Sequence, residues 1–118
     1  FEKERAGLAA LAITTDTSAL TAIANDYGYE RVFSRQVEGL GNSGDVFIGI
    51  STSGNSANII AAINTAKGKG LRTIALCGDG GKLKDLCDIS INVPSTRTAT
   101  IQECHIMIGH ILCSLIDA

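Results

Sequence analysis

The amino-acid sequence predicts an α/β fold in which helices flank a parallel β-sheet in three layers. Two observations lead to this prediction. Apolar runs of strand length alternate along the chain with stretches of helical periodicity. The runs are apolar throughout, which is typical of strands in a parallel sheet that is covered by helices on both faces. Four strands are expected, whereas such folds commonly have five or more.

The first half of the chain contains two expected strands and two expected helices. The apolar run from Leu8 to Thr14 predicts the first strand, and the polar residues after it could cap a helix from Ser18 to about Tyr27. A second helix is expected from the apolar residues at positions 32, 33, 37 and 40. Residues 41–45 are a loop rich in Gly, Asn, Ser and Asp, and residues 45–50 predict the second strand.

The second half repeats this alternation of helix and strand. Residues 57–67 predict a helix, because positions 59, 60, 63 and 66 are apolar and share one face. Residues 72–77 and 88–93 predict the third and fourth strands, with a short helix over residues 82–86 between them. Residues 100–118 predict a last helix that is apolar on most faces, so we expect it to be buried, partly against another subunit.

The composition indicates one folded domain that spans residues 1–118. Hydrophobic residues make up 45% of the chain and charged residues 19%, which excludes a disordered chain. The net charge of −2, with Lys and Arg scattered, argues against nucleic-acid binding. No run reaches the roughly 18 continuous apolar residues of a membrane span, and nothing resembles a signal peptide.

The cysteine pattern predicts a cytoplasmic protein. Cys77, Cys87, Cys104 and Cys113 form no CxxC motif. We therefore expect reduced, mostly buried thiols, and neither a disulfide framework nor a zinc cage.

The segment from residue 51 to residue 56, which we call the anion loop, is the strongest candidate for a binding site. Four of its six residues carry hydroxyl groups: Ser51, Thr52, Ser53 and Ser56. The loop joins a strand to the N-terminus of a helix, where unpaired N–H groups and the positive end of the helix dipole favour a phosphate or another oxyanion. The simpler alternative is that Ser53 or Ser56 only caps the helix, but capping needs one such residue.

Four polar side chains interrupt the apolar last helix: Gln102, Glu103, His105 and His110. Burying them without partners would cost about 1–3 kcal/mol apiece, so a site or an interface network should accompany them. Gln102 and His110 lie about 80° apart around the helix and roughly 12 Å apart along it. Both could reach one ligand or metal only by leaning toward each other, and two protein ligands do not make a zinc site. A hydrogen-bonded core histidine is the alternative for either His.

Two other segments have a structural and a functional interpretation. Asn25 and Asp26 end a predicted helix, where they could line a site or form a C-terminal cap and turn. The turn Gly78–Gly81 follows a predicted strand and could approach a ligand, but a structural turn is the simpler interpretation.

The anion loop and the strand before it resemble the signature of the SIS (sugar isomerase) domain. Within that family the chain is similar throughout to the bacterial phosphoheptose isomerases. Further matches lie at residues 11–18 (LAITTDTS), 24–28 (ANDYG), 33–37 (FSRQV), 101–106 (IQECHI) and 109–113 (GHILC). They follow one another in the family's order over nearly the whole chain, which makes the match specific.

The resemblance implies a fold, an assembly and a reaction. The fold is the flavodoxin-like SIS domain, of whose usual five strands four are expected here. The assembly is a homotetramer with sites at subunit interfaces. The reaction is the conversion of sedoheptulose 7-phosphate to D-glycero-D-manno-heptose 7-phosphate, which leads to the ADP-heptose of lipopolysaccharide.

The resemblance also implies the roles of individual residues. The phosphate would be held by Ser51, Thr52, Ser53 and Ser56. Asn25 and Asp26 would line the sugar site. Gln102 would bind substrate and, in zinc-containing members, the metal, while His110 would be the general acid/base and a metal ligand.

This sequence departs from the family pattern in two ways. The chain starts at Phe1 without an initiator Met, and the family's Asn-Gly-Gly-Ser loop, its catalytic Glu and further metal ligands would precede that residue. We therefore expect an N-terminal portion to be missing and this chain alone to be inactive. Arg97 and Thr100 stand where many members have Asp and Arg, so any role of that carboxylate is lost, although Arg97 could still meet an anion.

Two other functions remain open. One is a non-catalytic SIS paralogue that serves as a scaffold for the bacterial replication initiator, and the other is a sugar-phosphate sensor. His110 and its Gly-His-Ile-Leu-Cys context favour the enzyme, since the scaffold family tends not to keep that histidine. The lack of a DNA-binding segment counts against the sensor.

Overall fold

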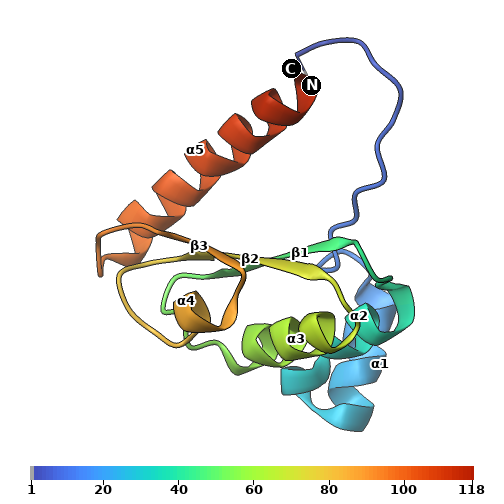
Figure 1. Ribbon diagram of the computed structural model, residues 1–118. Coiled ribbons are helices and arrows are strands. Elements are labelled where there is room, and N and C mark those ends of the chain that lie inside the picture. Colours follow the sequence, from blue (N-terminus) through green and yellow to red (C-terminus); the bar gives the residue numbers. More distant parts are fainter. Residues whose placement is uncertain (1) are drawn as a thin grey trace.

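A computed structural model describes residues 2–118 of the chain. The described residues form one sheet of three parallel strands in the order β1-β2-β3, with helices on both faces (Figure 1). The strands are β1 (Val46–Ser51), β2 (Arg72–Cys77) and β3 (Ile89–Asn92). The helices are α1 (Thr17–Tyr27), η1 (Tyr29–Arg31), α2 (Ser34–Leu40), α3 (Ala57–Gly68), α4 (Leu83–Leu86) and α5 (Thr98–Asp117). The predicted α/β class and parallel sheet are confirmed.

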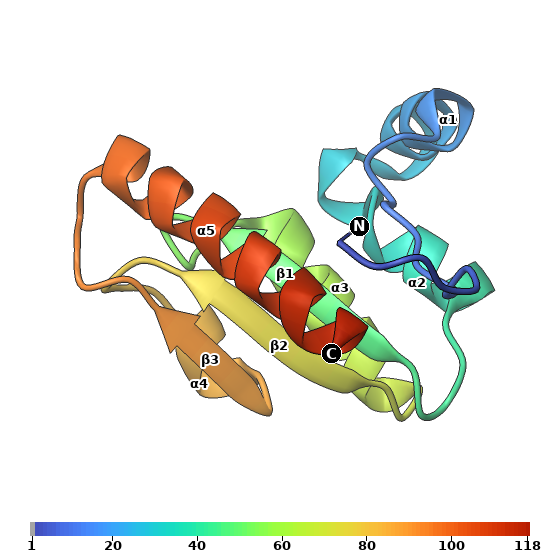
Figure 2. The same cartoon turned by 90° about the horizontal axis from the view of Figure 1, so that it is seen from above.

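The layers follow from the alternation of strand and helix. Helices α3 and α4 cover one face of the sheet, with α1 and α2 beside α3, and α5 crosses above the other face (Figures 1 and 2). The register sets Val46 opposite Arg72 and Ser51 opposite Cys77, so β1 and β2 end level with each other. The carboxyl ends of the strands therefore share one edge of the sheet, where ligands bind in open α/β sheets.

The core lies between the sheet and α3. Ile63 and Ala66 are completely buried on the face of α3 that the sequence predicts. Gly49 in β1 allows this close approach, because a Cβ atom there would lie 2.9 Å from Cγ2 of Ile59. A buried cluster around Ile63, Ala75 and Leu83 fixes α3 against the sheet and so fixes the anion loop that leads into it.

The expected strand at residues 8–14 is wrong, and the sheet has three strands in residues 2–118 where four were expected. This segment runs extended across the surface, with Leu8 58% and Leu11 69% exposed. It is held near Ile13, whose carbonyl accepts a hydrogen bond from Nε2 of Gln36 at 3.0 Å. An apolar run becomes a strand only when a neighbouring strand takes up its backbone N–H and C=O groups, and these residues pair with no strand.

Helix α5 is less buried than the sequence predicts. Ile101 and His105 are buried near its start, and Asp117 at its far end accepts a hydrogen bond from Arg5, but most of the apolar residues between them are exposed. Helix α5 is long and apolar enough to cross a membrane, but the core helix of a soluble protein can meet the same criterion of length and composition. Helix α5 therefore exposes a large part of its apolar surface to solvent within this chain.

All four cysteines are free thiols, as expected. Cys77 is buried and Cys87 and Cys104 are half-buried, whereas Cys113 is exposed, against the expectation of a buried thiol. Burial raises the pKa of the Cys77 thiol. It also raises the pKa of the Cys87 thiol, and this effect outweighs the neighbouring groups that lower it. Both therefore stay protonated near neutral pH, which argues against a nucleophilic role.

Candidate functional site

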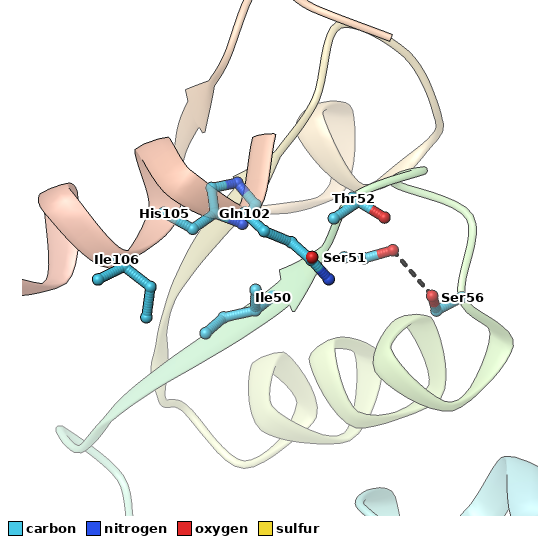
Figure 3. Close-up of a pocket in the computed structure, with 7 residues that line it drawn as sticks. All are labelled: Ile50, Ser51, Thr52, Ser56, Gln102, His105 and Ile106. Atoms are coloured by element: carbon cyan, nitrogen blue, oxygen red, sulfur yellow. Dashed lines mark hydrogen bonds between the residues drawn. The ribbon is translucent and has the colours of Figure 1, made fainter. Parts of the chain in front are cut away.

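The anion loop is held together by its own hydroxyl groups. Ser51, the last residue of β1, accepts a hydrogen bond from the backbone N–H of Gly54 at 3.1 Å. Its Oγ also lies 2.8 Å from Oγ of Ser56 and 3.5 Å from Oγ of Ser53. Ser53 in turn accepts from the N–H of Asn55 at 3.2 Å. Three of the four predicted hydroxyl groups are thus gathered around one point (Figure 3 draws the Ser51–Ser56 bond).

The hydroxyl of Ser56 does not cap α3. Ser56 occupies the N-cap position, but its side chain makes no hydrogen bond to the helix and contacts Ser51 instead. The backbone carbonyl of Ser56 accepts the first helical bond, from the N–H of Ile60 at 3.0 Å. The positive end of α3 is therefore left without a side-chain cap from the loop, which is the condition for holding an anion there.

A cavity of about 600 Å³ lies above the anion loop, at the carboxyl end of β1. Its lining residues are Ile50, Ser51, Thr52, Ser56, Gln102, His105 and Ile106 (Figure 3). The cavity brings the predicted residues Ser51, Thr52 and Ser56 together with Gln102 from the start of α5. Ser53 does not line it, and its hydroxyl oxygen instead accepts from the N–H of Asn55 within the loop.

His105 is part of this cavity although its function was not predicted. This residue is 7% exposed, and its Nε2 lies 3.2 Å from the carbonyl oxygen of Cys77 at the end of β2. A carbonyl only accepts, so Nε2 carries the proton in this contact. Nδ1 is buried and has no hydrogen-bond partner in residues 2–118. The sequence did hold a signal, because Gln102 and His105 are three residues apart and so share a helix face.

His110 lines a second, mostly apolar cavity of about 450 Å³ between α5 and the sheet. Ile50, His105 and Ile106 line both cavities, so the two are adjacent. Gln102 and His110 nevertheless lie in different cavities, as their angular separation around the helix suggests. In the described part of the chain no three His, Cys, Asp or Glu side chains are grouped so that they could hold a metal ion.

Asn25 and Asp26 lie elsewhere. They are exposed on α1, and Nδ2 of Asn25 donates to Oδ1 of Asp26 at 2.9 Å. In Figure 2 α1 lies to the side of the sheet beyond β1, opposite β3, and neither residue lines the cavity above the anion loop. Within one chain these two residues do not join the other predicted site residues, and their role stays a prediction.

The two positions that depart from the family pattern bond to each other. Arg97 donates from Nη1 to Oγ1 of Thr100 at 3.3 Å at the start of α5. Both side chains are outside the lining of the cavity.

Comparison with known proteins places this arrangement in a family. Residues 1–78 match the family described as the SIS domain. A phosphoheptose isomerase from a Nitratiruptor species is 65% identical over 118 residues, which are 99% of this chain and 63% of that protein. The phosphoheptose isomerase of Helicobacter pylori is 59% identical over 118 residues, with 99% of this chain and 62% of the relative covered.

Solved structures give the same result. A phosphoheptose isomerase from Francisella tularensis superimposes with a TM-score of 0.94 at 44% identity, covering 99% of this chain and 63% of that one. The phosphoheptose isomerase GmhA from Neisseria gonorrhoeae gives a TM-score of 0.89 at 56% identity, covering 92% and 62% respectively. The chain thus spans about three fifths of the length of the proteins that it matches.

Proposed function

Because the chain belongs to the SIS-domain family, we propose that the protein is an aldose–ketose isomerase that converts sedoheptulose 7-phosphate to D-glycero-D-manno-heptose 7-phosphate. One observation carries this proposal: three hydroxyl residues of the anion loop line the same cavity as Gln102, namely Ser51, Thr52 and Ser56. The names of the relatives support the choice of substrate, since both are phosphoheptose isomerases. The product would feed the synthesis of the ADP-heptose of lipopolysaccharide.

The anion loop would hold the phosphate group. Ser51, Thr52 and Ser56 line the cavity at the N-terminus of α3, whose N-cap side chain makes no hydrogen bond to the helix, and both the hydroxyl hydrogens and the helix dipole there favour a dianion. Ser53 would act by keeping the loop in shape through its bond to the N–H of Asn55. Anchoring the phosphate positions the reacting end of the sugar, which is how binding energy remote from the reaction raises the rate.

Aldose–ketose exchange moves a proton between neighbouring carbon atoms through an enediol, and it needs a base and an acid. We assign general acid/base chemistry to His110, and substrate binding to Gln102. A sugar whose phosphate sits in the anion loop would have to extend past Ile106 to reach His110 in the adjacent cavity.

Zinc belongs to this proposal only as a partner of Gln102 and His110. These two residues do not make a zinc site on their own, because they line different cavities and supply two of four ligands. The remaining ligands would have to come from outside the described chain, in which no three metal-binding side chains are grouped. We assign no step of the reaction to a metal.

We further propose that the protein works in the cytoplasm as a homotetramer whose subunits cover α5. The exposed apolar residues of this helix are Ile106, Met107, Ile111, Leu115 and Ile116. Several large apolar side chains exposed along one helix are typical of an interface. Sites at subunit interfaces would also give Asn25 and Asp26 a route to a neighbour's cavity.

The isomerase proposal is tested by turnover of sedoheptulose 7-phosphate with the complete protein and its His110→Ala variant. We expect turnover by the wild type and a loss of at least about a hundredfold in kcat for the variant, as is usual for a lost acid/base group. No turnover by a folded wild type, with an intact SIS fold, would favour the scaffold or sensor.

Light scattering of the same preparation tests the tetramer, and Ile111→Glu should reduce the measured mass to that of a smaller assembly. Recovery only with the membrane fraction would contradict the cytoplasmic location.

A further inference from the structure

The turn Gly78–Gly81 between β2 and α4 is bonded directly to the anion loop. The N–H of Gly78 donates to the carbonyl of Thr52 at 3.1 Å. Just beyond the turn, the N–H groups of Lys82 and Leu83 both donate to the carbonyl of Gly54 at 3.0 Å. Lys82 also donates its N–H to Oδ1 of Asn55 at 3.2 Å. Four hydrogen bonds therefore connect the turn and its exit to residues 52–55 of the loop.

The backbones of the turn and of the anion loop also pack directly against each other at Gly54 and Gly81, with no side chain between them. A Cβ atom on Gly81 would lie 2.3 Å from the carbonyl oxygen of Ser53 and 2.6 Å from Cα of Gly54. A Cβ atom on Gly54 would lie 2.5 Å from the carbonyl oxygen of Gly80. Gly54 and Gly81 also adopt φ angles of +67° and +90°, which favour glycine. Any side chain at either position must push the loop and the turn apart.

This contact bears on binding because the same loop residues form the cavity. Thr52 lines the cavity with its side chain, and its carbonyl oxygen is held by Gly78. Ser53 supports the loop through Asn55, and its carbonyl oxygen faces Gly81. A displacement of the loop by even part of an ångström would move several hydroxyl groups at once and weaken their hydrogen bonds to the phosphate, because hydrogen bonds depend steeply on distance and angle.

We propose that Gly81 is a positioning residue for the anion loop, and that its close contact with Ser53 and Gly54 sets the affinity for the phosphate group of the substrate. The proposal rests on the proposed function of the loop as a phosphate site. Gly81 does not touch the substrate. Because it has no side chain, the backbone of the turn can pack against the backbone of Ser53 and Gly54 and hold the loop in position.

The test compares three glycine-to-alanine variants of the complete protein. Gly81→Ala introduces both the clash with the loop and the strained φ angle. Gly80→Ala changes the same turn at a position where a Cβ atom meets nothing within 4 Å, and Gly44→Ala introduces the strain of a φ of +92° where a Cβ atom also meets nothing within 4 Å. These two controls separate the loop contact from local disturbance and from backbone strain.

We expect Gly81→Ala to raise KM for the sugar phosphate by about tenfold or more, with kcat changed by less than about threefold. The inhibition constant of inorganic phosphate should rise in the same ratio. Both controls should leave KM within about threefold of the wild type. A loss of folded enzyme alone would lower apparent kcat and leave KM unchanged. The proposal is overturned if Gly81→Ala has the same KM as Gly80→Ala.

A milder variant covers the case in which Gly81→Ala does not fold. Asn55→Ala removes one bond between the loop and the turn, and should raise KM by roughly threefold. An unchanged KM contradicts the proposal. If the wild type does not isomerise the sugar phosphate, the proposed function fails separately. Calorimetry with inorganic phosphate then decides the present inference, since Gly81→Ala must still bind more weakly than Gly80→Ala.

Discussion

Replacing Ser56 by alanine distinguishes an anion site from a helix cap. The structure directs this hydroxyl to Ser51 at 2.8 Å and not to the N–H groups of α3. A hydrogen bond to a charged group contributes about 1.5–3 kcal/mol. At about 1.4 kcal/mol per factor of ten, the loss of one such bond to the phosphate corresponds to a rise in KM of roughly tenfold to a hundredfold. We therefore expect Ser56→Ala to raise KM for sedoheptulose 7-phosphate by that amount.

The assay is steady-state kinetics together with thermal unfolding, and Ser90→Ala is the matched control. Oγ of Ser90 donates to Oδ1 of Asn92 at 2.7 Å in β3, outside the cavity. Both variants lose one neutral hydroxyl bond, which contributes about 0.5–1.5 kcal/mol to stability, so their Tm values should fall by similar amounts. Only Ser56→Ala should change KM. An unchanged KM in that variant, with Tm lowered as in Ser90→Ala, would refute the reasoning and leave Ser56 as a structural residue.

Three further predictions concern stability. Hydrogen bonds from the backbone N–H and hydroxyl of Thr73 hold the pKa of Asp88 below its ordinary value. The stability that its ionisation contributes is therefore complete above about pH 4 and is lost as the pH falls through the lower folded-state pKa. Asp88→Asn should make Tm fall less steeply below about pH 4, and an acid profile identical to that of the wild type would contradict this. Ile63 is completely buried, so Ile63→Ala should reduce the free energy of unfolding in urea by about 2–5 kcal/mol, whereas a loss under about 1 kcal/mol would mean that the site is loosely packed. Gln36 is buried and donates to the carbonyls of Ile13 and Val32, so Gln36→Ala should cost about 1–3 kcal/mol and speed amide hydrogen exchange over residues 12–15; unchanged exchange there would show that other contacts hold this segment.

The sequence predicts those elements whose signal lies in their own side chains. Helix α3 carries its buried face at a helical spacing, and β1 and β2 are apolar runs between loop residues. Residues 8–14 carry the same apolar signal as β1 yet form no strand, since a strand also requires a hydrogen-bonding neighbour. No local pattern encodes that neighbour.

The candidate site divides in the same way. The hydroxyls of the anion loop are contiguous in sequence and precede a helix, so their gathering could be predicted. The approach of α5 depends on Ile101, whose Cδ1 would lie 2.6 Å from a Cβ atom on Gly78. Gln102 and His105 follow Ile101 on α5 and line the cavity, but no local pattern reveals a contact between segments so far apart in the sequence. The docking of Gly81 under Ser53 is equally invisible to local patterns.

The Ser51–Ser56 pair has a consequence for the speed of binding. Either hydroxyl can donate to the other, and Ser51 already accepts from the N–H of Gly54, so the oxygen atoms are in place before any anion arrives. When a phosphate enters, only hydroxyl hydrogens have to turn, and motions of this size take picoseconds to nanoseconds. The phosphate end of the site therefore needs no closing movement of its own.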